Sequence, residues 1–565
     1  MSDAKDIRQE NNVWSSKYFA LSMGAIMVLF MVRQWSQFLI FHYGYRQKTG
    51  IFARAFSKIS LFLRRFFLSK VFGLAVDRLL LYTIYWAINL ILLLTNNKME
   101  AEYIARRLGW ISVANLALLV FLALKNTPLA PLSAQSYEKL RPLHKTAGYT
   151  CILVTVLHGL IFVTESAISD ILYKFKEQKD YAGAIAGLAM IFIGVSTVPW
   201  IMPKQYEVFY VMHVTMFILI MITLGMHRPE FKDSTIIITI FIACLWMYDR
   251  IIRAGKLCWN FFGNYATITP LPNNAIRVQL SRPICSRPGS HAFLWLPAIR
   301  WAETHPFTMV SVDPVQFVIR VYDGFTRDLY NAAQSSPGRS LRCSVDGGYG
   351  QVPNFGVYDK VILVAGGSGA SFTFAVALKL IQKIAEKRAS KTIDFIWAVQ
   401  YGDTLEWFED ELRQLEMSPI VNLVIHVTRG SSASSPKLVP KSDGGDLEKG
   451  ASRSTREASS IKSTGIREGR PDISSLIKTA TASADPNDRI MVGACGPVKM
   501  IDQTRNAVSE SMCEDGPSIT LYTEVSCPHY VTRSLYELTC FRNLNGEQGF
   551  DRKGSQMYEF YGQHL

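Results

Sequence analysis

The chain of 565 residues is 49% apolar and 19% charged, and its formal net charge is +14. These values exclude a wholly disordered chain, a fibrous repeat and a small disulfide scaffold, and the length allows two large domains or three to four smaller ones. Arg and Lys gather at the ends of apolar segments, which favours membrane flanks over a nucleic-acid surface. The nine cysteines show no CxxC spacing, so neither a zinc site nor a disulfide framework is predicted.

Seven apolar stretches before about residue 250 predict helices that cross a membrane. They cover residues 18–41, 74–95, 109–124, 148–167, 182–202, 207–227 and 234–249. Basic residues crowd the loop between the first two stretches, so the positive-inside rule places that loop in the cytosol. Seven spans then put the N-terminus outside and everything after Tyr248 in the cytosol.

Four histidines in these spans form two pairs with equal spacing. His144 and His158 are fourteen residues apart in the fourth span, and His213 and His227 are fourteen apart in the sixth. Fourteen residues are close to four helical turns, so each pair shares one helix face, with about 21 Å between its members. The two helices are parallel, so His144 is level with His213 and His158 with His227. Two levels of facing imidazoles suit two stacked six-coordinate haems, whereas one isolated histidine would more simply line a polar cavity.

From about residue 265 the pattern changes to short alternating strands, which predicts a small antiparallel barrel. Strands are expected at 275–280, 292–296 and 317–321, with His305-Pro306-Phe307-Thr308 before the last of them and a turn at 323–326.

A second soluble unit begins with the apolar run 360–364, which is typical of a strand in a parallel sheet. This run leads into Gly366-Gly367-Ser368-Gly369 and then a helical stretch. Strand, glycine turn and helix together favour phosphate binding, because glycines let the backbone approach and a helix N-terminus attracts an anion. Further strands are predicted at 392–399, 420–427, 489–493 and 519–525, and the third of these ends in Ala494-Cys495-Gly496-Pro497. The composition of residues 430–487 predicts a disordered insertion.

The chain resembles the ferric reductase and NADPH oxidase superfamily of flavocytochromes b, and most closely its divergent fungal metalloreductases. The resemblance covers roughly residues 105–430 and 487–526. It rests on the order of the two histidine pairs, the HPFT motif at 305–308, the glycine turn at 366–369 and Cys495-Gly496-Pro497. It implies a multi-pass α-helical membrane domain followed by a cytosolic ferredoxin-reductase-like module, which has an antiparallel β-barrel for FAD and an α/β domain for the nucleotide. The expected divisions are 1–105 for the first spans and basic loop, 106–250 for the haem domain, 265–355 for the FAD domain, 358–526 for the nucleotide domain and 527–565 for a tail.

The resemblance also implies roles for individual residues. The haem iron ligands would be His144 and His213 for an inner haem b, and His158 and His227 for an outer one. The FAD contacts would be His305, Pro306, Phe307, Thr308 and Ser311 at the isoalloxazine and ribityl chain, and Arg320, Gly324 and Thr326 at the pyrophosphate. The NADPH contacts would be Gly366, Gly367, Ser368 and Gly369 at the pyrophosphate, with Cys495, Gly496 and Pro497 near the nicotinamide.

Three departures from the family pattern affect these expectations. Gln400 follows the second nucleotide-domain strand where the family commonly has Arg to meet the 2′-phosphate, which weakens the preference for NADPH over NADH. Arg429, after the next strand, is our candidate for the missing cation. Glu524-Val525-Ser526 runs on into a tail where the family usually ends at a flavin-stacking aromatic, and the outer acceptor surface carries no motif.

The expected function is electron transfer from cytosolic NADPH through FAD and two haems b to an acceptor across the membrane, most simply Fe³⁺ or Cu²⁺. A superoxide-producing NADPH oxidase would use the same residues with O₂ as acceptor. A transporter or proton channel with histidine relays is a third reading, which leaves the flavin and nucleotide motifs unexplained. The expected partners are NADPH, Fe³⁺ or Cu²⁺ chelates or O₂, and membrane lipid, with no nucleic acid; a homo-oligomer stays open. The plasma membrane is the expected location, with the endoplasmic reticulum as the alternative.

Overall fold

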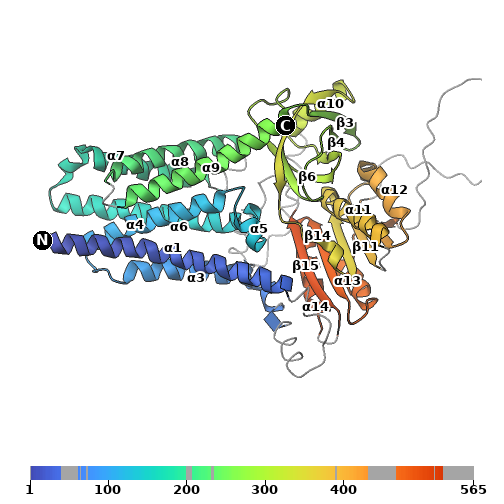
Figure 1. Ribbon diagram of the computed structural model, residues 1–565, viewed down its shortest axis with the longest axis horizontal. Coiled ribbons are helices and arrows are strands. Elements are labelled where there is room, and N and C mark those ends of the chain that lie inside the picture. The colour runs from blue at the N-terminus through green and yellow to red at the C-terminus, as the bar shows by residue number, and fades with distance from the viewer. Residues whose placement is uncertain are drawn as a thin grey trace, which may run out of the picture.

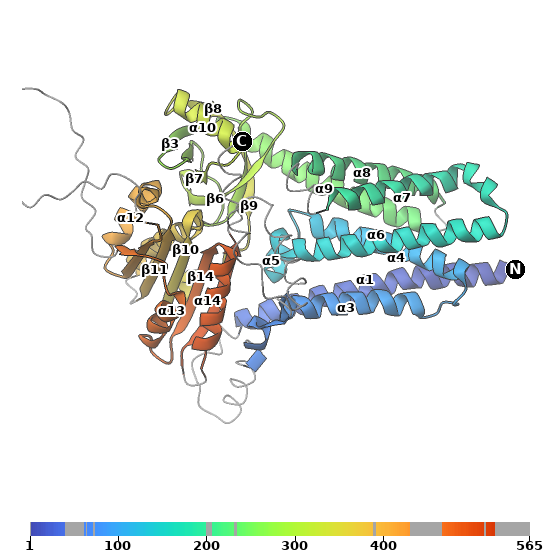
Figure 2. The same cartoon turned by 180° about the vertical axis from the view of Figure 1, so that it is seen from behind.

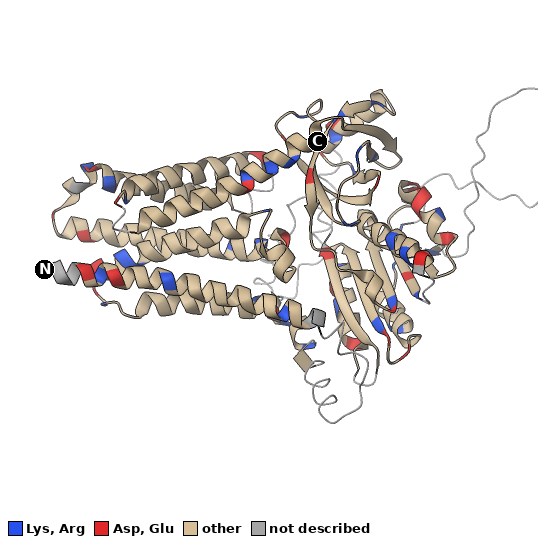
Figure 3. Ribbon diagram, viewed as in Figure 1, with Lys and Arg blue, Asp and Glu red and all other residues tan. Residues whose placement is uncertain are grey.

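The computed structural model describes residues 2–39, 62–63, 65–71, 74–198, 206–230, 234–387, 391–429, 466–513 and 516–525. In this part of the chain, long helices form one half and two β-sheets with their helices form the other (Figures 1 and 2). The N-terminus lies at the end of the helical half that is farther from the sheets (Figure 1). Charged residues are sparse along the middle of the helices (Figure 3). The chain is therefore a multi-pass membrane protein with a soluble module after its helices.

Seven of the described helices are long and apolar enough to cross a membrane. They are α1 (Ser2–Leu39), α3 (Val76–Leu94), α4 (Ala101–Ala123), α6 (Tyr137–Ile168), α7 (Gln178–Ser196), α8 (Tyr206–His227) and α9 (Thr235–Phe261). Shorter elements join them: β1 (Lys70–Val71), β2 (Leu74–Ala75), α5 (Leu129–Ser133) and the 3₁₀ turn η2 (Leu172–Lys176). The predicted number of spans is confirmed, although residues 40–41 and 199–202 of the predicted spans lie outside the described residues.

Several helices extend beyond their predicted apolar cores because their polar side chains find partners. Arg107 in the first turns of α4 is only 2% exposed, and it donates to Asn12 Oδ1 and to the carbonyls of Leu92 and Asn96 near the end of α3. These bonds satisfy the buried guanidinium, so α4 can include an arginine that a hydropathy pattern alone would place outside the span. At the other end of the bundle, α9 continues to Phe261 and carries its basic residues into the soluble module.

A buried ion pair joins α9 to the soluble module. Arg253 Nε lies 2.6 Å from Asp346 Oδ2, and the two side chains are 11% and 0% exposed. The hydroxyl of Tyr349 donates to the other carboxylate oxygen over 2.6 Å. The pair therefore holds the module to the last membrane helix.

Replacing Asp346 with alanine should leave the Arg253 guanidinium buried without its partner and destabilise the protein by about 3–5 kcal/mol. The thermal unfolding midpoint of the purified protein should fall by several degrees, whereas the double variant Arg253→Met/Asp346→Leu should recover much of the loss. Equal midpoints for the single and double variants would contradict this account.

The first sheet of the module is antiparallel and has seven strands in the order β8-β3-β4-β7-β6-β5-β9. Its strands are β3 (Tyr265–Leu271), β4 (Ala275–Leu280), β5 (His291–Trp295), β6 (His305–Val312), β7 (Val315–Arg320), β8 (Ser340–Arg342) and β9 (Ser344–Tyr349), with helix α10 (Phe325–Ser335) after β7. The first half of β6 pairs with β5, and its second half pairs with β7 after a register shift between Met309 and Ser311. The predicted antiparallel domain is confirmed, but α10 replaces what the sequence suggested was only a turn.

The second sheet is parallel and has six strands in the order β13-β12-β11-β10-β14-β15. Its strands are β10 (Lys360–Gly366), β11 (Thr392–Val399), β12 (Val421–Val427), β13 (Ile466–Glu468), β14 (Arg489–Gly496) and β15 (Ser518–Val525). The 3₁₀ turn η4 (Phe355–Val357) precedes the first of these strands. The strands are connected by the 3₁₀ turns η5 (Gly367–Gly369) and η6 (Gly402–Phe408) and by the helices α11 (Ala370–Lys387), α12 (Glu409–Glu416), α13 (Ile473–Ala482) and α14 (Val498–Ser511). The chain runs from β10 toward β11 on one side and returns to β14 on the other, so the strand order reverses between β10 and β14, where open α/β sheets bind their ligands.

The predicted insertion at 430–487 is too long, because its last part is folded. Strand β13 pairs with β12, and α13 buries Ile473 and Ile477 in the apolar core of the sheet. These residues are one helical turn apart, but the surrounding Ser, Thr and Lys hid this apolar face. Residues 430–465 lie outside the described part of the chain.

Aromatic packing fixes the turn that follows β10. Phe374 of α11 stacks on Phe408, with 4.8 Å between the ring centres, and meets the edge of Trp397 of β11. The indole of Trp397 then donates to the carbonyl of Gly367 over 3.2 Å. The core of the nucleotide domain therefore holds the glycine turn directly.

Candidate functional site

The inner histidine pair lies where α6 and α8 face each other. The ring centres of His144 and His213 are 6.5 Å apart, with 57° between their planes. His144 Nδ1 lies 3.0 Å from the carbonyl oxygen of Leu119 on α4. A carbonyl only accepts, so Nδ1 must donate, which leaves Nε2 of His144 with a free lone pair. His213 Nδ1 is buried and has no hydrogen-bond partner among the described residues.

The outer histidines, His158 further along α6 and His227 at the end of α8, are anchored in the same way. His158 Nδ1 donates to Ala105 O of α4, and His227 Nδ1 donates to Lys179 O of α7, both over 2.7 Å. Two glycines let these helices approach the rings. A Cβ on Gly109 would lie 3.1 Å from His158 Cε1, and one on Gly183 would lie 2.6 Å from His227 Nδ1. Backbone carbonyls therefore fix the ring orientation of three of the four histidines.

The chemistry of these residues fits haem iron, which takes histidine nitrogen as a ligand. Histidines that bind metals usually donate their other ring nitrogen to a carbonyl or carboxylate, which three of these do. Metal–imidazole bonds of about 2.0–2.1 Å on both sides would leave the ring centres about 6 Å apart. The observed 6.5 Å between His144 and His213 agrees with that spacing. The inner pair lies near the end of the bundle that contacts the soluble module.

The HPFT motif lies on the half of β6 that pairs with β5. His305 stacks on Phe325 of α10 with 4.1 Å between the ring centres, and its Nε2 is 3.0 Å from Glu303 Oε2. Burial lowers the pKa of His305, and the Glu303 carboxylate only partly opposes this effect. Pro306 is exposed and Phe307, Thr308 and Ser311 are half-buried, so this strand keeps an accessible face.

The three residues expected at the FAD pyrophosphate come together around the start of α10. Gly324 precedes the helix with φ of +74°, a conformation that favours glycine. Thr326 Oγ1 accepts from the Tyr322 amide over 2.7 Å and donates to its carbonyl over 2.8 Å. Arg320, exposed at the end of β7, lies with its guanidinium carbon 5.5 Å from the ring centre of Tyr322. The turn thus presents an arginine beside a helix N-terminus, where anions are favoured.

The two nucleotide-domain motifs touch each other at the reversal of strand order. A Cβ on Gly369 would lie 2.3 Å from Cys495 O, and one on Gly366 would lie 2.7 Å from Pro497 Cδ. Gly496 also packs against this turn, because a Cβ there would lie 3.1 Å from Gly366 N. Gly367, with φ of +55°, and Ser368 stay partly exposed above this contact, whereas Cys495 is only 6% exposed. The glycines are therefore required by the close approach of η5 to the end of β14.

Arg429 lies beside Gln400 at the carboxyl edge of the parallel sheet. Its amide donates to Gln400 O over 2.9 Å, and its Nη1 donates to the Tyr401 hydroxyl over 3.2 Å. The Arg429 guanidinium therefore lies at the same strand end as Gln400, the position where the family commonly has an arginine.

Sequence reasoning missed the contact between the two halves. Tyr137 Oη at the start of α6 lies 2.9 Å from His291 Nε2, and that same nitrogen is 2.8 Å from Glu138 Oε1. His291 pairs with Thr308 of the HPFT motif in the sheet register, and His144 lies two turns after Tyr137 on α6. The contact therefore links the two motifs. Glu524, which pairs with Cys495 across β14 and β15, was also missed; burial raises its pKa. No short motif marks these residues, because they come from distant parts of the chain.

Three family matches follow one another along the chain. Residues 108–224 match the ferric reductase like transmembrane component, residues 261–353 an FAD-binding domain, and residues 358–509 the ferric reductase NAD binding domain. Two of the three matched models, the transmembrane component and the NAD binding domain, are those of ferric reductases, so these parts of the chain are similar to ferric reductase domains.

Curated members of the ferric reductase family align with most of this chain. The "Probable cell surface ferric reductase kap2" of Aspergillus oryzae is 26% identical over 55% of this chain and 45% of its own length. "Ferric/cupric reductase transmembrane component 1" of Candida albicans is 25% identical over 74% of this chain and 56% of its own. The chain thus spans about half the length of these relatives. A solved ferredoxin reductase of carbazole 1,9a-dioxygenase aligns at 16% identity over 46% of this chain and 68% of that one, with a TM-score of 0.30, which is too low for a structural argument.

Proposed function

We propose that the protein is a transmembrane metalloreductase, which passes electrons from NADPH on the module side to Fe³⁺ or Cu²⁺ chelates on the other side. The observation that carries the proposal is the pair of facing histidine levels on α6 and α8, whose inner level adjoins the module with the FAD and nucleotide motifs. The names of the relatives, which are ferric and ferric/cupric reductases, support the choice of acceptor. We infer a plasma-membrane location with the module in the cytosol.

In this proposal the four membrane histidines would hold two haems b, and His144, His158 and His227 would each offer the Nε2 that their Nδ1 contact leaves free. The accessible face of β6 with the start of α10 would hold FAD. When bound, FAD would accept a hydride and haem would carry single electrons. The chain itself orients the rings through Leu119, Ala105 and Lys179, whose carbonyls hold each Nδ1–H. The stack on Phe325 fixes the His305 ring on the strand that would bind the flavin.

The nucleotide would bind across the contact between η5 and the end of β14. The partly exposed residues Gly367 and Ser368, with the N-terminus of α11 directly after them, would receive the pyrophosphate. Cys495 would lie beside the nicotinamide at the same edge. We assign the 2′-phosphate to Arg429, whose contact with Tyr401 holds it at the end of β11.

Replacing Arg429 with alanine should lower the preference for NADPH over NADH by about 10–100-fold, because a hydrogen bond between two charged groups is lost. The ratio of kcat/KM for the two nucleotides measures this effect. Arg413→Ala is the matched control, since Arg413 pairs with Glu409 on an exposed face of α12. An unchanged ratio in the Arg429 variant would refute the assignment.

The acceptor can be tested with purified protein in lipid vesicles, NADPH and an Fe³⁺ chelate. We expect the same rate of Fe²⁺ formation with and without oxygen, and no effect of superoxide dismutase in air. A rate that collapses without oxygen and is sensitive to dismutase in air would show that superoxide carries the electrons, and the metalloreductase proposal would fail in favour of an oxidase.

A further inference from the structure

A cavity of about 290 Å³ lies where the helical half meets the antiparallel sheet. We call it the junction cavity, and the residues that define it here are Lys125, Asn126, Tyr137, Lys256, Tyr349 and Gln351. Its walls come from the segment between α4 and α6, from α9 and from the end of β9. Its volume lies just below the range of about 300–1,000 Å³ for drug-sized ligands, so it suits a small group.

The junction cavity is lined by two lysines and by no carboxylate. Lys256 Nζ donates to Asn126 Oδ1 over 2.6 Å and lies 4.8 Å from the ring centre of Tyr349. Lys125 Nζ lies 3.2 Å from the ring centre of Phe293. Within the described residues, no carboxylate lies within ion-pair distance of either ammonium group. The cavity therefore offers two lysine side chains with no internal counter-ion.

The nearby carboxylates form ion pairs with other cations. Asp346 pairs with Arg253, and Asp249 accepts from Asn126 and pairs with Arg250. Burial lowers the pKa of Lys125 to about 6, and repulsion by Arg253 and Arg250 adds to this effect against a weaker attraction by Asp346 and Asp249. An anion in the cavity would supply the counter-charge that the ammonium lacks.

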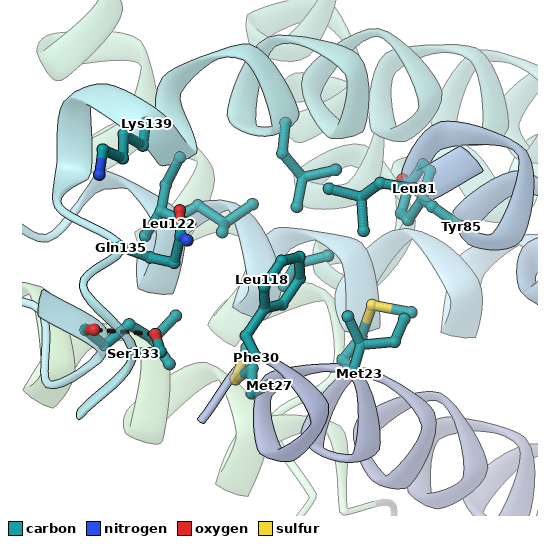
Figure 4. A pocket seen from close by; sticks show the side chains of 14 residues that line it. Met23, Met27, Phe30, Leu81, Tyr85, Leu118, Leu122, Ser133, Gln135 and Lys139 are labelled. Atoms are coloured by element: carbon teal, nitrogen blue, oxygen red, sulfur yellow. Dashed lines mark hydrogen bonds between the residues drawn. The ribbon is translucent and has the colours of Figure 1, made fainter. Parts of the chain in front are cut away.

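The position of the cavity indicates where such an anion comes from. It lies at the ends of α4, α6 and α9 that adjoin the module, so a membrane around these helices would bring lipid headgroups to this level. Basic pockets between membrane helices on the cytoplasmic side bind phosphorylated lipid headgroups. The second cavity, of about 80 Å³ between α1, α3, α4 and α6, differs because its walls are mostly apolar, with Gln135 and Lys139 at one end (Figure 4).

We propose that the junction cavity binds a phosphate monoester, carried by the inositol headgroup of a membrane lipid, between Lys125 and Lys256. Tyr137 lines the cavity and also contacts His291, so the ligand would sit at the contact between α6 and the flavin sheet. The site is independent of the proposed electron transfer, because its binding needs neither nucleotide nor acceptor.

The test uses the full-length chain with its cofactors in phosphatidylcholine vesicles, without NADPH. Binding of phosphatidylinositol 4-phosphate is measured against unphosphorylated phosphatidylinositol, and soluble inositol 1,4-bisphosphate is tested in a separate arm. We expect Lys125→Ala and Lys256→Ala each to weaken binding of the phosphorylated lipid by about fivefold. Lys125→Arg should retain binding, and Lys98→Ala, which removes an exposed lysine from the loop between α3 and α4, should leave it unchanged.

Each outcome decides the proposal. Lysine-dependent binding of the lipid alone identifies a headgroup at the membrane surface, and equal lysine-dependent binding of the soluble phosphate identifies a free phosphomonoester; both support the site. Absence of binding, or the same loss in Lys98→Ala, overturns it. The proposal is also overturned if Lys125→Ala lowers FAD or haem content, read from the visible spectrum, without changing phosphate binding, because the lysines would then serve a cofactor.

Discussion

Replacing His227 with alanine is expected to abolish reduction of an acceptor on the far side of the membrane while NADPH-driven reduction of a dye at the module continues. The rate of far-side reduction should fall by more than about 10–100-fold. That smaller loss is typical when a group that only orients a metal ligand is removed, whereas here the ligand itself is removed. The visible spectrum gives a second readout, since the haem content per chain should fall by about half. Haem binding at the inner level should persist, because His144 and His213 are retained.

The matched control for this variant is His426→Ala. His426 is also buried, and its Nδ1 also lies near a backbone carbonyl, 3.2 Å from Gly469 O, but it belongs to the soluble module. The control should keep both the spectrum and the transfer across the membrane. Full haem content together with far-side reduction in the His227 variant would contradict the assignment of the outer pair.

Replacing Gly369 with alanine is expected to abolish NADPH-driven turnover. The new Cβ would lie 2.3 Å from the carbonyl oxygen of Cys495, and backbone on both sides cannot yield as a flexible side chain would. Overpacking of this kind typically costs about 1–3 kcal/mol, and here the cost falls on the turn that would bind the pyrophosphate. NADPH affinity and the rate of flavin reduction should fall together, whereas chemical reduction of the haems by dithionite should be unaffected.

Gly402→Ala is the control for that variant, because a Cβ there would meet no atom within 4 Å. Its NADPH affinity should match that of the natural chain. Normal NADPH affinity in Gly369→Ala would show that the nucleotide binds away from η5.

The sequence predicted the features that depend on local periodicity. Equal spacing of His144–His158 and His213–His227 was sufficient to predict facing pairs, because helix geometry relates residue number to height along the axis. The apolar run before Gly366 likewise predicted a buried parallel strand, and β10 has that position. Such features were predictable because one element alone determines them.

Features that depend on tertiary partners were not predictable. Arg107 is buried within the bundle because carbonyls and Asn12 satisfy its guanidinium, and those partners lie on α1 and at the end of α3. The contact between Tyr137 and His291 joins residues 154 apart, with no motif to mark either one. Helix α13 was missed because two isoleucines in a Ser- and Thr-rich segment give too weak a pattern without the sheet beneath them.

The central claim is that electrons cross the membrane through the two histidine levels. The most direct measurement seals an impermeant Fe³⁺ chelate inside vesicles that contain the purified protein and adds NADPH outside. NADPH does not cross the bilayer, so only molecules with the module outward can respond. The account predicts reduction of the sealed chelate, and its loss in His227→Ala. Reduction only when chelate and NADPH share the same compartment would contradict it.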